Sequence, residues 1–330
     1  MASHMEVVLA RPVAATPCAA DFELTRRGAP DLRDGELLVR VIHLSLDPYI
    51  GSRLRGRHMG EPAPGVGESL PGFSVGEVVA SRHADFAVGE HVLGECGWAE
   101  LGVMRGDEAR RIDRPLSAHL GVLGMPGLTA WAGVTQLAKV AEGDVFLVDA
   151  AAGPVGGTAG QIARNLGARA IGIAGGDAKC ALVRDTYGFD DCIDYKQADW
   201  PGALKAACPE GPSVHFENVG LSVLQQVMPA LRPYGRVVLC GLAEHYQAEG
   251  PPASIPLGAI VGKRAQMLGL VVYDFYPRLA EWLAMAEPWI AEGRLTYAED
   301  LAHGLAAAPA HFEKLMAGDN IGKSVVKVAP

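Results

Sequence analysis

The sequence predicts an α/β protein in which a β-rich domain is followed by a doubly wound sheet of six parallel strands. Three observations lead to this prediction. Before Leu116 the chain carries many short, valine-rich apolar segments broken by Gly and Pro, which is typical of a β-rich, barrel-like domain. From Leu116 onward, helical segments alternate with short apolar strands, as in a wound sheet. One of these strands runs straight into closely spaced glycines and a helix, which is how such a sheet often begins.

The first domain is expected to be discontinuous. Its clearest strands are 36–43, 74–80 and 90–93. Near the end of the chain, residues 323–328 (KSVVKV) alternate like a further strand of this domain. We therefore expect residues 1–117 and 294–330 to form the first domain, and residues 118–293 the second. The active site is expected in the cleft between them, at the carboxyl ends of the wound-sheet strands.

The second domain is expected to contain the wound sheet. Helical segments separate its short apolar runs, so each run predicts one parallel strand. Six strands suit a doubly wound sheet. They are expected at 145–149, 170–174, 192–195, 214–218, 236–240 and 266–272.

The first of these strands ends in a glycine-rich turn, AAAGPVGGTAG at 150–160. Gly153 and Gly156 are expected to let the backbone turn tightly and approach a phosphate, because neither carries a Cβ. The helix that starts near Pro154 directs its free N–H groups and positive dipole end at the anion, and Gly160 lets that helix lie close on the sheet. With the next strand this is a β-α-β unit of ~30 residues, which favours dinucleotide binding over a plain α/β scaffold.

The end of the second strand bears on which dinucleotide binds. It reads GGDAK at 175–179. An NADP site needs room and a cation for the extra phosphate, whereas an NAD site usually places a carboxylate on the ribose hydroxyls. The two glycines and Lys179 favour NADP. NAD stays open because Asp177 lies close by, and Lys179 also fits an ordinary solvated lysine at a helix start.

Composition excludes several classes of function. The formal net charge of -9 leaves no basic surface for nucleic acid or an anionic membrane. Six scattered cysteines predict neither disulfides nor a metal site. No signal peptide or run of 18 apolar residues is present, so a cytoplasmic protein is expected. The opening MASHM resembles an expression-vector remnant, and we take Met5 as the natural start.

Several motifs, in order along the chain, resemble one known family. They are LSLDPY at 44–49, MPGLTAW at 125–131, AAAGPVG at 150–156 with Gly160 and Gln161, FENVG at 216–220 and GDNIGK at 318–323. Together they are similar to the medium-chain dehydrogenase/reductase superfamily, and within it to the zinc-free NADPH-dependent double-bond reductases: prostaglandin, 2-alkenal and curcumin reductases. The resemblance implies a GroES-like catalytic domain, a Rossmann domain and a homodimer joined edge to edge through the wound sheets.

The resemblance also bears on metal and cofactor sites. Zinc-dependent alcohol dehydrogenases of the superfamily carry Gly-His-Glu where this chain reads PGFSVGE at 71–77. The three protein ligands of a catalytic zinc are therefore missing, and no metal is expected. The resemblance implies NADPH contacts as follows: pyrophosphate at Ala152, Gly153, Pro154, Val155 and Gly156; 2′-phosphate at Lys179 and Tyr195; riboses and adenosine at Asn218 and the segment 240–246 with Cys240, Gly241 and Tyr246; nicotinamide at Leu270, Val271 and Val272; and the far end of the cofactor at Asn320.

Some of these residues also fit simpler interpretations. Leu270, Val271 and Val272 fit plain strand core, and Asn320 fits a turn. The resemblance implies that tyrosine hydroxyls stabilise the enolate that forms when hydride reaches the β-carbon of an enone or enal. Tyr246 and Tyr49 match, although each also fits a core tyrosine.

One position departs from the family pattern. The family usually has a substrate-contacting tyrosine where this chain has Gly262. Tyr273 and Tyr276 lie near enough in sequence to replace its hydroxyl. The pattern also shifts in DPYIG at 47–51, where the family more often has Met-Arg after the tyrosine. Both changes reshape the pocket and leave the substrate open.

The leading hypothesis is an NADPH-dependent reductase of activated C=C bonds in α,β-unsaturated ketones or aldehydes. One alternative is an NADPH-dependent quinone reductase, since zinc-free relatives of this architecture pass hydride to quinones. Another is an NADPH-binding protein without efficient catalysis. The expected partners are a small apolar enone, enal or quinone and a second copy of the chain.

Overall fold

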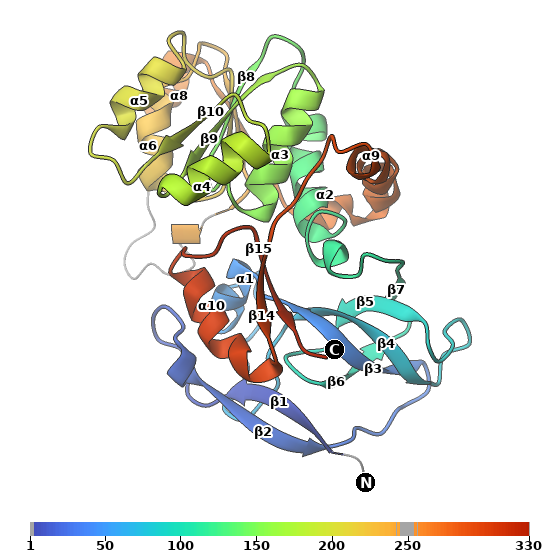
Figure 1. Cartoon of the computed structure of the whole chain (residues 1–330). Helices are drawn as coiled ribbons and strands as arrows, with labels where there is room; N and C mark the ends of the chain where they lie inside the picture. The colour runs from blue at the N-terminus through green and yellow to red at the C-terminus, as the bar shows by residue number, and fades with distance from the viewer. Residues whose placement is uncertain (1–2, 242, 245–253, 256, 330) are drawn as a thin grey trace. The chain divides into compact units, whose positions relative to one another are not determined.

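The computed structural model describes residues 3–241, 243, 244, 254, 255 and 257–329. The chain divides into two compact units. The first unit contains residues 1–120 and 299–330, and the second contains residues 121–245 and 250–298. Figure 1 labels the elements of both. None of the helices within the described ranges combines the length and the apolar run that a membrane span requires.

The first unit is built on a seven-stranded sheet of order β14-β15-β3-β4-β5-β7, with β6 also paired to β3. β15 runs antiparallel to β3 and pairs Val325 with Ser45, so the prediction that the last strand returns to the first sheet is confirmed. A separate antiparallel pair, β1 and β2, completes the strands. The bounds are β1 Ser3–Leu9, β2 Phe22–Gly28, β3 Glu36–Ser45, β4 Phe73–Ser81, β5 His91–Glu95, β6 Leu101–Arg105, β7 Arg110–Arg111, β14 Glu299–His303 and β15 Lys323–Lys327.

An aromatic core joins the β1–β2 pair to the helices of this unit. Trp98 is fully buried, stacks on Phe22 at 5.4 Å and meets the edge of Phe312 at 5.3 Å. Its indole N–H donates to the carbonyl of Pro71 at 3.0 Å, as a buried tryptophan requires. The helices of the unit are α1 Pro48–Arg53 and α10 Ala308–Met316, with the short turns η1 Ala19–Asp21, η2 Ser117–Leu120 and η6 Leu305–Ala307.

The second unit contains the wound sheet, and each of its six strands starts within one residue of the predicted position, although the last ends at Gly269 rather than at the predicted residue 272. They are parallel and ordered β10-β9-β8-β11-β12-β13. The direction of winding reverses between β8 and β11, which is where such sheets bind ligands. The bounds are β8 Val145–Val148, β9 Arg169–Ala174, β10 Asp191–Asp194, β11 Val214–Glu217, β12 Arg236–Leu239 and β13 Gln266–Gly269.

Helices cover both faces of this sheet (Figure 1). The residues Leu147, Ile171 and Ile193 face α5 and α6, while alternate residues such as Phe146 and Phe216 face the side of α2, α3 and α4. Burial on both faces explains why these strands read as short continuous apolar runs. The bounds are α2 Met125–Trp131, η3 Ala132–Leu137, α3 Pro154–Asn165, α4 Asp177–Ala181, η4 Leu182–Thr186, α5 Trp200–Ala207, α6 Leu221–Ala230, α8 Leu257–Lys263, η5 Val272–Arg278 and α9 Leu279–Ala291.

Candidate functional site

The glycine-rich turn after β8 brings backbone close to backbone. A Cβ built on Gly156 would lie 2.6 Å from the Ala150 carbonyl oxygen, so only glycine allows this approach. Gly153 takes part in the tight turn, but its backbone is not left-handed. Gly153 has an ordinary φ of -84°, and the left-handed residue is Ala150, with a φ of 45°. Gly153 closes the turn by donating its N–H to the Ala150 carbonyl at 2.9 Å.

The first turn of α3 faces outward from this loop. Gly153 is the N-cap residue, its helix has no side-chain cap, and Pro154 follows at the first helical position. The early N–H groups of a helix have no partner within the helix, so an uncapped N-terminus is suited to an anion. Gly153, Pro154 and Val155 are half-buried, and Ala152 is buried. The five predicted pyrophosphate residues, 152–156, therefore run without a break from the loop into the first turn of α3.

Gly160 serves a different contact from the expected one. A Cβ there would lie 1.8 Å from the ring of Phe189. The absence of a side chain makes room for that ring, which is buried beside the start of β10. The glycine thus packs the helix against an aromatic side chain rather than directly against the sheet.

The two residues predicted for the 2′-phosphate, Lys179 and Tyr195, lie after the adjacent strands β9 and β10. The Tyr195 ring lies against Gly175, where a Cβ would meet it at 2.9 Å. Lys179 is half-buried in α4, and Asp177 is exposed at the start of that helix. Asp194 accepts hydrogen bonds from the backbone N–H of Gly176 at 2.8 Å and of Lys196 at 2.9 Å.

The Asp194 carboxylate is therefore an ionised neighbour of this group of residues. Its hydrogen bond from the Gly176 N–H, with those from Lys196 and Gln197, lowers its pKa. The sequence reasoning did not include Asp194. Its position at the end of β10, beside β9 in the order of a wound sheet, is the signal that could have identified it.

Asn218 lies at the carboxyl end of β11 and is held tightly. Its backbone N–H donates to Asp149 Oδ1 at 2.6 Å, and its side-chain amide donates to the Asp149 carbonyl at 3.1 Å. Gly241 approaches it closely, because a Cβ on Gly241 would lie 2.5 Å from the Asn218 carbonyl oxygen. Cys240 precedes Gly241 and donates its N–H to the Glu217 carbonyl at 3.0 Å. The structure therefore places Asn218, Cys240 and Gly241 together at the switch point of the sheet.

Three buried ionisable side chains lie beneath this site and were missed by the sequence reasoning. Asp149, His215 and Glu217 have no exposed surface, and their donor and acceptor atoms lie within 4.8 Å of one another. His215 Nε2 is 3.0 Å from Glu217 Oε2 and 3.6 Å from Asp149 Oδ2. The available signal was their place at the ends of the first and fourth wound strands, which are adjacent in this strand order.

The first unit holds Tyr49 and Asn320 through one buried ion pair. Lys323 Nζ donates to the Leu46 carbonyl at 2.7 Å and to Asp47 Oδ1 at 2.8 Å. Asp47 is the N-cap residue of α1, so Tyr49 lies in the first turn after it. Asn320 donates its side-chain amide to the Gly322 carbonyl at 2.9 Å, one residue before Lys323. The Lys323–Asp47 ion pair therefore connects the two chain segments that carry Tyr49 and Asn320.

Tyr49 also contacts a histidine. Its ring is half-buried and lies 5.1 Å from the His58 ring, centroid to centroid. Burial lowers the pKa of His58, and the charge of Glu61 opposes that effect. The sequence reasoning did not single out His58.

The predicted nicotinamide residues differ in exposure. Leu270 is buried and continues the sheet by donating its N–H to the Leu239 carbonyl at 3.0 Å. Val271 is exposed, and Val272 begins η5. Gly262 is exposed in α8, and a Cβ there would have no neighbour within 4 Å among the described residues. Tyr246 lies outside the described residues.

Tyr273 and Tyr276 form a stacked pair, with ring centroids 6.1 Å apart. Both are exposed side chains of η5.

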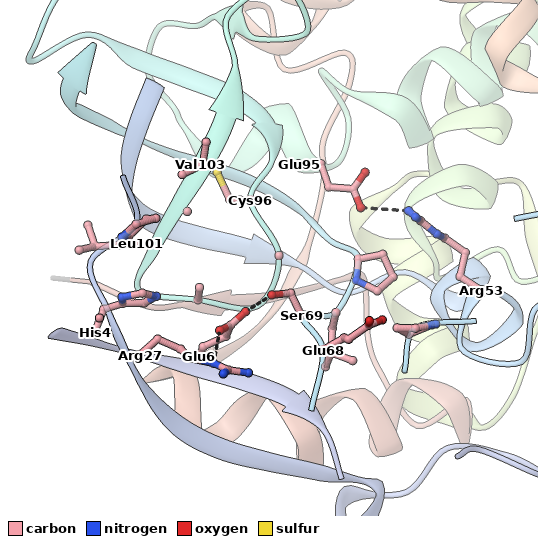
Figure 2. A pocket seen from close by; sticks show the side chains of 18 of the residues that line it. His4, Glu6, Arg27, Arg53, Glu68, Ser69, Glu95, Cys96, Leu101 and Val103 are labelled. Atoms are coloured by element: carbon pink, nitrogen blue, oxygen red, sulfur yellow. Dashed lines mark hydrogen bonds and ion pairs between the residues drawn. The ribbon is translucent and has the colours of Figure 1, made fainter. Parts of the chain in front are cut away.

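A cavity of about 650 Å³ lies within the first unit. Figure 2 shows Glu6 between Ser69 and Arg27, and Arg53 pointing at Glu95. The Arg27–Glu6 and Arg53–Glu95 contacts measure 3.2 and 2.9 Å, so these charges neutralise one another. None of the predicted site residues that the structure describes lines this cavity.

Two family models match the two parts of the chain. The family model described as "N-terminal domain of oxidoreductase" matches residues 5–112, and the one described as "Zinc-binding dehydrogenase" matches residues 154–288. The chain is 37% identical to the NADPH-dependent curcumin reductase of Escherichia coli over 98% of this chain and 96% of that protein. It is 35% identical to the NADP⁺-dependent 2-alkenal reductase of Nicotiana tabacum over 99% and 98%.

A solved structure shows the same similarity. The crystal structure of CurA from Vibrio vulnificus in complex with NADPH has a TM-score of 0.93 and 39% identity, and the alignment covers 99% of each chain.

Proposed function

The chain belongs to the alkenal and curcumin reductase family of the medium-chain dehydrogenase/reductase superfamily, and from that premise we propose that it reduces activated C=C bonds with NADPH. The substrate class is α,β-unsaturated ketones and aldehydes. The observation that carries the proposal is the uncapped first turn of α3. This turn packs so closely on the preceding loop that a Cβ on Gly156 would lie 2.6 Å from the Ala150 carbonyl oxygen. The family similarity makes the bound anion a dinucleotide rather than an isolated phosphate.

The described residues fit NADPH at two places. The first turn of α3 offers backbone N–H groups to a pyrophosphate, with Ala152, Gly153, Pro154, Val155 and Gly156 at its rim. At the end of β9, the Tyr195 ring lies against Gly175, and Lys179 supplies a positive charge for a 2′-phosphate. Asn218, Cys240 and Gly241 would contact the riboses, and Leu270, Val271 and Val272 would contact the nicotinamide. Asn320 would hold the far end of the cofactor.

NADPH supplies the hydride, which reaches the β-carbon of the substrate. The chain must then stabilise the negative charge that develops on the carbonyl oxygen and orient the substrate for transfer. We assign hydroxyl donation to Tyr49 and Tyr246. Zinc has no part in this proposal, because residues 71–77 offer no histidine at the position of the superfamily's ligand motif.

The test is NADPH oxidation followed with a long-chain 2-alkenal, a phenyl-substituted enone and a simple quinone, with NADH in parallel. We expect turnover of the enal or enone with NADPH, and little with NADH. Turnover of the quinone alone would replace the proposal with a quinone reductase. Tight NADPH binding without oxidation by any acceptor would make the chain a cofactor-binding protein without efficient catalysis.

We predict that Lys179→Ala raises the KM for NADPH by about tenfold or more, because a charge-assisted contact with the 2′-phosphate is lost. The KM for NADH should change little, since NADH lacks that phosphate. Initial rates over a range of cofactor concentrations measure both values. Lys205→Ala is the matched control, because Lys205 is an exposed lysine on α5 of the same unit. Parallel losses with both cofactors would reject the assignment of Lys179.

We also propose a homodimer that forms through the edge of the wound sheet. β13 is the last strand of that sheet, and the neighbouring α8 exposes Leu257 at 75% and Val261 at 72%. A sheet edge beside exposed apolar side chains favours a protein partner, and the family similarity makes a second copy that partner.

Val261→Arg should convert the dimer into monomers, because the charge would be buried between the subunits. Light scattering coupled to size-exclusion chromatography measures the mass. Val88→Arg is the control, since Val88 is similarly exposed, at 65%, on the first unit. A dimer that persists in Val261→Arg, or that is lost in Val88→Arg, would place the interface elsewhere.

A further inference from the structure

We propose that Asp149 is a buried carboxylic acid that shares one proton with Glu217 and positions Asn218, and that loss of this proton weakens NADPH binding. The protonation and the positioning rest on the geometry of the cluster. The effect on NADPH rests additionally on the proposed function.

Each carboxyl group of the cluster uses one oxygen to hold backbone. Asp149 Oδ1 accepts the N–H of Asn218 at 2.6 Å. Glu217 Oε1 accepts the N–H groups of Val219 at 2.7 Å and Gly220 at 2.6 Å. These bonds connect the end of β8 to the turn after β11, and so determine where Asn218 lies. Asp149 is therefore a positioning residue, which acts on the cofactor site through Asn218.

The other oxygen of each carboxyl group lies near His215 Nε2, which can donate only one proton. His215 Nε2 donates to Glu217 Oε2 at 3.0 Å. Asp149 Oδ2 and His215 Nδ1 are buried and have no hydrogen-bond partner among the described residues. A second proton on His215 would leave a buried Nδ1–H without an acceptor. A proton on Asp149 Oδ2 instead lets that oxygen donate toward Glu217, and it removes the repulsion between two buried carboxylates.

The direction of the pKa shifts agrees with this assignment. Burial and then the charge of Glu217 raise the pKa of Asp149 well above its ordinary value. Burial opposes ionisation of Glu217 as well, but the hydrogen bonds from His215 and from the Gly220 N–H outweigh burial and lower that pKa. The two carboxyl groups therefore titrate as a pair that retains one proton.

Among the described residues of the surrounding elements, none adds a positive charge that would stabilise a second carboxylate. Cys240, directly after β12, is half-buried, and burial of its thiol with the charges of Asp149 and Glu217 raises the pKa of that thiol. Glu244 lies at the Gly220 turn, where it accepts the Ser222 N–H at 3.2 Å. No residue of α6 is ionisable. The arginines that begin β9 and β12 lie at the opposite ends of those strands.

The cluster lies directly beneath the proposed pyrophosphate site. A Cβ on Gly156 would lie 2.9 Å from the Asp149 carbonyl oxygen, so the first turn of α3 rests on Asp149. Ionisation of Asp149 would place a second buried negative charge close to a bound anion. NADPH should therefore bind better to the protonated form.

Both the stability of the folded chain and its affinity for NADPH should depend on pH. Because the pKa of Asp149 is raised in the folded chain, its contribution to stability is present at low pH and is lost as pH rises through the folded value. NADPH affinity should fall over the same range. The loss of one proton limits the rise of the dissociation constant to about tenfold per pH unit above that pKa.

Two measurements test the proposal on the full chain. The first is infrared difference spectroscopy of the C=O stretch of a protonated carboxyl group, with isotope-labelled aspartate. We expect one buried aspartic acid band that is absent from Asp149→Asn and retained in Asp185→Asn, whose aspartate is exposed on η4 of the same unit. The second is NADPH fluorescence titration from neutral to alkaline pH. Asp149→Asn should bind with a dissociation constant that is independent of pH, whereas Asp185→Asn should follow the wild type.

Each contrary result would reject one part of the proposal. Absence of the band from the wild type, or its persistence in Asp149→Asn, would reject the shared proton. A stoichiometric metal found by elemental analysis would also reject the shared proton, because the cation would then occupy the place of that proton. Equal pH dependence in Asp149→Asn and the wild type would reject the coupling. If the wild type binds no NADPH at any pH, the proposed function fails, while the infrared result still decides the protonation. If Asp149→Asn does not fold, the pH titration of the labelled band in the wild type decides it.

Discussion

Replacing Lys323 with alanine is expected to lower the free energy of unfolding by about 3–5 kcal/mol, because it leaves a buried carboxylate without its cation. Lys323 is 3% exposed and Asp47 is 5% exposed. Burial lowers the pKa of Lys323, and the charge and hydrogen bond of Asp47 counter that effect. Urea denaturation monitored by circular dichroism measures the loss. Turnover should fall as well, since Tyr49 and Asn320 flank the two partners in sequence.

A second lysine of the same unit provides the control. Lys314 contacts Asp300 at 2.6 Å, but its side chain is 44% exposed. Water already solvates the Lys314 ammonium, and Asp300 keeps the hydrogen bond from the Ile321 N–H when the pair is broken, so Lys314→Ala should cost no more than about 1 kcal/mol. Similar losses for Lys323→Ala and Lys314→Ala would show that burial does not set the strength of the Asp47 pair.

Gly156→Ala is expected to lower kcat/KM for NADPH by about 10²-fold. The added Cβ would lie 2.6 Å from the Ala150 carbonyl oxygen and 2.9 Å from that of Asp149. Both contacts are with backbone atoms, so α3 must move away from the turn after β8. A displacement of this size takes the helix N–H groups out of position for the pyrophosphate. Steady-state rates at varied NADPH concentration, with one saturating enal, measure the effect.

The control for Gly156→Ala is the same change where space is open. Gly28 ends β2 with no positive φ, and a Cβ there meets no described atom within 4 Å. Gly28→Ala should leave kcat/KM unchanged. Unaltered NADPH kinetics in Gly156→Ala would mean that the first turn of α3 does not bind the cofactor, and the proposed function would lose its main support.

Local patterns in the sequence determined most of the fold. The apolar runs predicted all six wound strands, because a strand buried on both faces must be apolar along its length. The alternation at 323–328 predicted the strand β15, which pairs with β3. The glycines at 153, 156 and 160 located the turn and helix after β8. These features depend on neighbouring residues, so one sequence is enough to recognise them.

Contacts between distant residues could not be predicted in this way. Lys323 pairs with Asp47 across 276 positions, and neither residue shows in sequence that it will be buried. The turn strain lies at Ala150 rather than at a glycine, because the surrounding hydrogen bonds hold the chain there. Gly160 was expected to let the helix lie close on the sheet, but the side chain packed against it is that of Phe189, which the sequence did not indicate.

By itself, the sequence determined the family, the order of strands and helices, and the position of the glycine turn, since periodicity and turn chemistry are properties of adjacent residues. Only the tertiary structure placed Asp149, His215 and Glu217 within 4.8 Å of one another, without exposed surface. The protonation of a buried carboxyl group depends on the charges and hydrogen bonds that folding places around it after water is excluded. That environment exists only where β8 and β11 end side by side.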